Sequence, residues 1–223
     1  MDAMQRSDRD PDPTKDEEAE AAAATTSLSG IADAFEKLAG SLSSDGGGLR
    51  LDALCDACAP VSVLFGCLGI AFKFAKLEYV SKVSDLTEAS KKYVTLENII
   101  DVDVVNRTVK KQGSHTRNLR RVRLGLDLIR ALFEQFLSSQ DNSLKEAATT
   151  AYSQVCAPYH SWAVRTAVYA GMYALPSRDQ LLLKLNENAH DAEKKMRRYI
   201  DTVIPVIEYI DKLYLCRNIT LDW

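Results

Sequence analysis

A run of arginines opens a predicted helix in the middle of the chain. Arg117, Arg120, Arg121 and Arg123 follow Ser114, which is a good N-cap residue. The first turn of a helix carries partial positive charge from unpaired N–H groups, so cations are disfavoured there. An anion would relieve this conflict, because N–H groups and guanidinium groups can both bind it. The run therefore predicts an anion-binding site.

The body of the same helix is apolar below its basic start. Stepping at helical spacing from Arg121 leads to Leu124, Leu128 and Leu132. A charged head above an apolar face complements an amphiphile with an anionic headgroup and hydrocarbon tails. The alternative is a solvated basic face or a patch for nucleic acid.

A second predicted helix, from Pro60 to about Lys91, shows the same gradient. Its apolar face begins at Leu64 and ends at Glu78 and Lys82. Glu78 and Lys82 are four residues apart, and such a pair is often an exposed ion pair worth about 0.3 kcal/mol. Two helices with the same gradient favour a shared binding site over that alternative.

His160 stands among aromatic residues, with Trp162 and Arg165 just after it. A lone histidine in such surroundings is more often a hydrogen-bonding residue than a catalyst. The sequence contains no nucleophile motif, no metalloprotease motif, no phosphate-binding glycine loop and no dinucleotide fingerprint. We therefore predict no catalytic residue, no metal and no cofactor. Trp162 suits either the core or a membrane interface, where Arg165 could meet anionic lipid.

Charge is distributed unevenly along the 223 residues. The formal net charge is -3, but residues 1–25 alone contribute -5, which leaves +2 for residues 26–223. The first 25 residues are rich in Asp, Glu, Pro and Ala, so we predict a disordered acidic extension there and one folded domain over 26–223. Mild basicity suits weak contact with an anionic membrane surface and argues against a nucleic-acid partner.

The five cysteines are an odd number and follow a polar N-terminus without a signal-peptide pattern. We expect buried free thiols in a reduced, cytoplasmic protein that associates with membranes only peripherally. Cys55 and Cys58 are spaced like metal ligands, but no second pair or nearby histidine accompanies them, which argues against zinc.

Helical periodicity extends through the whole of the predicted domain, and no strand pattern competes with it. We predict an all-α fold, a compact bundle or a sandwich of helices. The last predicted helix contains Pro205, which we expect to bend or restart it. The predicted helices cover residues 27–44, 51–59, 60–91, 95–111, 115–138, 143–157 and 160–173. Another predicted helix starts at Pro176-Ser177, and the last one ends near Asn218.

Three stretches resemble the glycolipid transfer protein superfamily: 63–74 (VLFGCLGIAFKF), 113–119 (GSHTRNL) and 169–176 (YAGMYALP). The resemblance covers roughly residues 27–223, up to the terminal LDW. It implies a two-layer helical sandwich that encloses one sphingolipid, with a headgroup site at the surface above an apolar chamber.

Within that superfamily, the chain resembles the branch that binds ceramide-1-phosphate. The resemblance implies that Lys82, Arg117 and Arg121 hold the phosphate and that His160 binds the acyl carbonyl. Glu78 stands where the family has an aspartate that accepts from the ceramide amide N–H. The glycolipid-binding branch has an asparagine in place of Lys82 and a tryptophan near the Arg117 region, neither of which is present here. Trp162 matches a tryptophan that lies on the membrane-docking surface in the family.

These observations together predict a monomeric transfer protein for ceramide-1-phosphate-type sphingolipids. One alternative is a lipid-gated signalling module, whose bound lipid switches a protein partner; the same branch includes a plant cell-death and defence regulator. A lipid hydrolase is a third class, which product formation would reveal.

Overall fold

The computed structural model describes residues 27–44, 48–139 and 141–223. The acidic extension predicted for residues 1–25 lies outside the described residues. Apart from two isolated bridges, the described segments contain helices and turns without strands, so the all-α prediction is confirmed. The elements are α2 (Leu28–Ser44), α3 (Leu51–Cys58), α4 (Val61–Cys67), η1 (Ile70–Phe72), α5 (Lys73–Ser90), α6 (Leu96–Val105), α7 (His115–Ser138), α8 (Leu144–Val155), η2 (Ala157–Tyr159), α9 (Trp162–Gly171), η3 (Met172–Ala174), α10 (Arg178–Lys184) and α11 (Ala189–Leu215).

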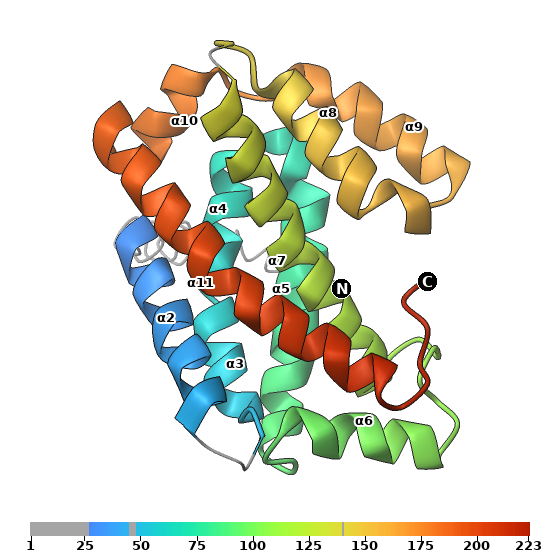
Figure 1. Cartoon of the computed structure of the whole chain (residues 1–223). Coiled ribbons are helices and arrows are strands. Elements are labelled where there is room, and N and C mark those ends of the chain that lie inside the picture. Colours follow the sequence, from blue (N-terminus) through green and yellow to red (C-terminus); the bar gives the residue numbers. More distant parts are fainter. Residues whose placement is uncertain (1–26, 45–47, 140) are drawn as a thin grey trace, which may run out of the picture.

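The helices form two layers, and α7 lies in the front one in Figure 1. Helices α11 and α7 pass in front of α3, α4 and α5 in that view, and α2 packs along α11. On the opposite side of α7 lies α8, followed by α9. The long helix α7 therefore contacts α5, α8 and α11, and different faces of it contribute to the core and to the site.

Helix starts are fixed by capping side chains. Ser114 accepts a hydrogen bond from the backbone N–H of Arg117, as the sequence predicted. Thr95 forms a capping box with Asn98 at the start of α6, and Ser161 caps α9. These caps set the phase of each helix, so they decide which side chains face the site.

The predicted continuous helix from Pro60 to Lys91 is wrong. The chain forms α4, then the short turn η1, then α5, because Gly69 adopts a φ of 79°, in the left-handed region that interrupts a helix. The apolar face traced from Leu64 to Lys82 is therefore not one helical face. The break leaves Ile70 and Phe74 exposed, at 77% and 83%.

Other boundaries differ from the predicted ones for local reasons. Helix α6 ends at Val105, well before Lys111, and Arg107 adopts a φ of 56° in the turn that follows. Pro205 does not restart the last helix: α11 continues through it. The segment from His160 to Tyr173 begins its helix only at Trp162 and ends in the short turn η3.

The core is continuous and largely apolar. Tyr199 of α11 lies at its centre, with Phe35 and Phe133 against its ring in edge-on contacts. Four cysteines are buried free thiols as predicted, but Cys216 is exposed. Burial raises the pKa of the Cys55 thiol to about 11, which keeps it protonated and unreactive. Among the described residues, no helix is long and apolar enough to cross a membrane.

Candidate functional site

An apolar chamber of about 530 Å³ opens between α5, α7, α8 and α9. Glu78, Arg121 and His160 contribute charged or basic groups to its wall, and most of the remaining lining is hydrocarbon. The other lining residues are Phe65, Ile70, Phe72, Phe74, Ala75, Tyr79, Leu124, Gly125, Leu128, Tyr152, Cys156, Val164, Ala167, Val168 and Gly171. Three of the residues predicted for the lipid site thus line one cavity.

The basic end of this site belongs to α7. Arg117 and Arg121 lie one turn apart, directly after the Ser114 cap. Burial lowers the pKa of Arg121, and the neighbouring positive charge of Arg117 lowers it further. Arg121 takes part in none of the ion pairs found among the described residues. A half-buried cation beside a like charge is the environment that a bound anion stabilises.

The other two arginines of the run are structural. Arg120 is only 2% exposed, donates to the carbonyl of Leu221 at 2.8 Å, and lies 3.7 Å from Asp211. Arg123 pairs with both Asp127 and Asp211. The interpretation of all four arginines as one anion-binding cluster was therefore too broad. Helical phase directs two of them toward α11 and the C-terminal residues.

Lys82 lies on α5 and is not among the residues that line the chamber. Its ammonium nitrogen lies 3.9 Å from Glu78 Oε1 and 3.9 Å from Asp85 Oδ2. Asp85 in turn accepts a hydrogen bond of 3.2 Å from the side-chain amide of Asn118, the residue after Arg117. This hydrogen bond links α5 to the first turns of α7.

His160 is positioned by a residue that the sequence reasoning missed. Its Nδ1 lies 2.9 Å from the hydroxyl of Tyr152, and both side chains line the chamber. Burial lowers the pKa of His160, and Arg121 lowers it further, so the imidazole is neutral at pH 7. The one sequence signal for Tyr152 was its place on the apolar face of the helix that precedes His160.

Exposed apolar side chains occur on η1, α5 and α9, which all contribute residues to the chamber wall. Trp162 is 74% exposed at the start of α9, so it is not a core residue, and Arg165 lies one turn later, also exposed. Ile70 and Phe74 line the chamber and project into solvent. η1 is in contact with α9, so these exposed side chains come from adjacent elements. Trp162 and Arg165 were predicted from the sequence, but Ile70 and Phe74 were not, because an unbroken helix was predicted over residues 60–91.

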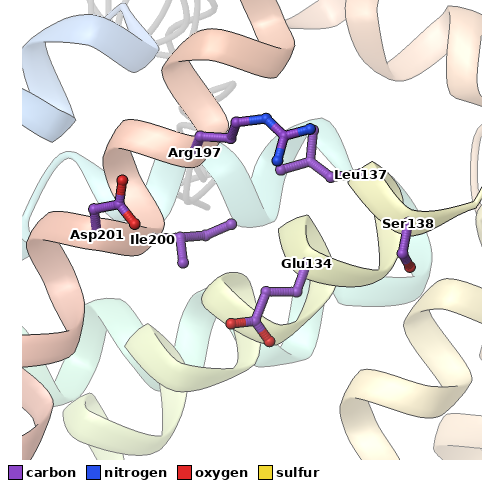
Figure 2. A pocket seen from close by; sticks show the side chains of 6 residues that line it. All are labelled: Glu134, Leu137, Ser138, Arg197, Ile200 and Asp201. Atoms are coloured by element: carbon purple, nitrogen blue, oxygen red, sulfur yellow. The ribbon is translucent and has the colours of Figure 1, made fainter.

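A different hollow, of about 390 Å³, lies between the end of α7 and α11 (Figure 2). Figure 2 shows Glu134, Leu137 and Ser138 on one helix facing Arg197, Ile200 and Asp201 on the other. Charges of both signs surround its few apolar groups. It therefore lacks the separation of charge from hydrocarbon that the chamber has.

Comparison with known proteins places this arrangement in a family. Residues 49–187 match the family model described as glycolipid transfer protein. The chain belongs to the glycolipid transfer protein family. The matched segment begins just before α3 and ends after α10, so it includes every residue of the chamber wall.

Relatives of this family member are similar over most of its length. An Arabidopsis thaliana protein described as ACD11 homolog protein is 64% identical over 204 residues, which cover 89% of each chain. Mouse ceramide-1-phosphate transfer protein is 31% identical over 165 residues, or 66% of this chain and 75% of the relative. The crystal structure of an alanine mutant of Arabidopsis ACD11 with C12 ceramide-1-phosphate has a TM-score of 0.85 and 48% identity, and it covers 88% of this chain and 98% of that one. The predicted fold, a helical sandwich of the glycolipid transfer protein type, is confirmed.

Proposed function

We propose that this protein transfers ceramide-1-phosphate-type sphingolipids between membranes without covalent chemistry. The observation that carries the proposal is the juxtaposition of Arg121, a half-buried cation without an ion-pair partner among the described residues, and a largely hydrocarbon chamber whose wall it helps to form. The relatives named for ceramide-1-phosphate binding and transfer support the same ligand.

In this proposal, Lys82, Arg117 and Arg121 hold the phosphate. Arginine forks suit bidentate contact with phosphate oxygens, and the N–H groups in the first turn of α7 add to the positive potential. A sugar headgroup carries no charge to balance these cations, so it would leave them unpaired. The site is therefore selective for an anionic headgroup.

Glu78 and His160 bind the amide region of the lipid. A carboxylate at Glu78 can accept from the ceramide N–H. When the Tyr152 hydroxyl donates to His160 Nδ1, the proton of the neutral ring resides on Nε2, which can then donate to the acyl carbonyl. Each polar group of the ceramide thus meets a complementary side chain.

The chamber keeps the hydrocarbon tails out of water while the protein moves between membranes. Exposing them would cost about 0.8 kcal/mol per methylene, so the lipid stays bound until the protein reaches another membrane. Release needs only an alternative apolar environment, which a membrane provides.

Docking at that membrane uses the exposed rim of the chamber. Trp162 suits the interfacial zone, and Arg165 suits anionic headgroups. We assign these contacts to a monomeric domain over residues 26–223 that acts peripherally at cytoplasmic membrane surfaces. A lipid that leaves the membrane at this rim would enter the chamber directly.

Turnover distinguishes transfer from the sensing alternative. The experiment mixes donor vesicles containing labelled ceramide-1-phosphate with acceptor vesicles and a small amount of protein. A transfer protein moves many lipids per molecule, whereas a sensor stops near one. Mass spectrometry of the same mixture tests for hydrolysis, and the proposal requires that the lipid be recovered intact.

A further inference from the structure

Tyr79 occupies an unusual position in the wall of the chamber. It projects from α5, is only 4% exposed, and its hydroxyl donates a 3.0 Å hydrogen bond to the backbone carbonyl of Cys58. Its side chain lines the chamber, and it also lines a second hollow of about 330 Å³. Tyr79 is therefore part of the wall between two cavities.

The ring of Tyr79 reaches α7 because Gly125 leaves room for it. A Cβ atom at Gly125 would lie 2.5 Å from Cδ2 of the tyrosine, so no larger residue fits without moving the ring. Phe65 of α4 packs beside the same ring, with centroids 5.1 Å apart. The ring thus spans the distance between α4 and the backbone of α7, and the hydroxyl fixes its other end to α3.

The hollow behind Tyr79 has a different character from the chamber. Val80 and Val83 provide apolar surface, but its outer part includes Glu88 and Lys91, which form an exposed ion pair. The remaining lining residues are Ala59, Ser62, Ser84 and Thr87. A hydrocarbon chain that passed Tyr79 would enter this hollow and then meet charged, solvated groups.

We propose that Tyr79 is a specificity-determining residue that closes the chamber toward this hollow and limits the length of the acyl chain taken up. This inference rests on the proposed function, because it concerns the tail of the same lipid. Rotating Tyr79 aside would leave its buried hydroxyl without the Cys58 carbonyl, which is costly. A chain long enough to need that rotation is bound less well than one that ends before the ring.

The experiment compares the transfer of C12 and C24 ceramide-1-phosphate, supplied together in donor vesicles and quantified by mass spectrometry in the acceptors. The main variant is Tyr79→Met, because methionine fills similar space but is unbranched and can move aside. Tyr79→Phe is an intermediate variant, because it keeps the ring in the Gly125 niche but lacks the hydroxyl that binds the Cys58 carbonyl. Tyr79→Leu replaces the main variant if the methionine variant does not fold, as judged by thermal denaturation.

We expect the C24-to-C12 ratio to rise by about tenfold in Tyr79→Met, and to rise by a smaller factor in Tyr79→Phe, which loses the hydroxyl anchor but keeps the ring. A folded Tyr79→Met or Tyr79→Leu protein with the wild-type ratio would overturn the inference while leaving the proposed function standing. If the wild-type protein transfers neither lipid, the proposed function fails, and the inference fails with it. Total transfer by the wild type therefore tests the function, and the ratio between variants tests Tyr79.

Discussion

Arg120 and Arg121 are consecutive residues of α7 with opposite structural roles. Arg120 is buried against Asp211 and the carbonyl of Leu221, whereas Arg121 lines the chamber. A helix turns by about 100° per residue, since 3.6 residues make one turn, so neighbours in sequence face different surroundings. One arginine therefore stabilises the junction with the C-terminal residues, and the next is available to a ligand.

Replacing Arg120 tests its structural role. Arg120→Ala removes the cation from a buried pair and leaves the Leu221 carbonyl without its donor, so we expect unfolding to become easier by about 3 kcal/mol. Chemical denaturation measures this change, with the exposed Arg165→Ala as the control. A loss below about 0.5 kcal/mol, which is ordinary for surface changes, would contradict the assignment.

Glu78 tests the amide contact. Glu78→Asp keeps a carboxylate acceptor, so we expect transfer within a few-fold of the wild-type rate. Glu78→Ala leaves the ceramide N–H unpaired at a cost of about 1–3 kcal/mol, so most transfer should be lost. Glu78 is also 3.9 Å from Lys82, and an exposed ion pair would be worth only tenths of a kcal/mol. An active Glu78→Ala protein would remove this residue from the site.

Trp162 tests the docking surface. Its side chain is 74% exposed, so Trp162→Ala should change the free energy of unfolding by less than about 0.5 kcal/mol and still weaken partitioning to anionic vesicles. Vesicle sedimentation measures the partitioning. The other tryptophan, Trp223, is a matched control, because its indole N–H donates to the Thr220 carbonyl. Equal losses for the two tryptophans would refute a special role for Trp162.

The pKa of His160 predicts a pH dependence of stability. Burial and Arg121 hold this pKa below its ordinary value of 6.5 in the folded protein, so below pH 6.5 the unfolded chain binds a proton that the folded chain does not. The contribution of His160 is therefore complete above pH 6.5 and declines as the pH falls toward the folded pKa. We expect the difference in Tm between wild type and His160→Gln to narrow from pH 7.5 to 5.5. A difference that stays constant or widens would show that the pKa is not lowered.

Sequence periodicity predicted α7 well because a strong cap and a long apolar face agree with each other. It could not separate the structural arginines, Arg120 and Arg123, from Arg117 and Arg121, since that distinction depends on the position of Asp211 on α11. It predicted one helix in place of α4 and α5, because the sequence around a glycine in an apolar run does not show whether that glycine has a positive φ. Gly69 has one here. The hydrogen bond between Tyr152 and His160 could not be predicted from periodicity, because it joins α8 to the residue that follows η2.

The headgroup claim is tested most directly by reversing charge at the phosphate site. Wild type, Arg117→Glu and Arg121→Glu are compared for transfer of ceramide-1-phosphate between vesicles, with circular dichroism as the check on folding. Because each variant places an anion where the phosphate would lie, we expect both to be folded and to lose nearly all transfer. Transfer near the wild-type rate by both folded variants would contradict the assignment of the start of α7 as the phosphate site.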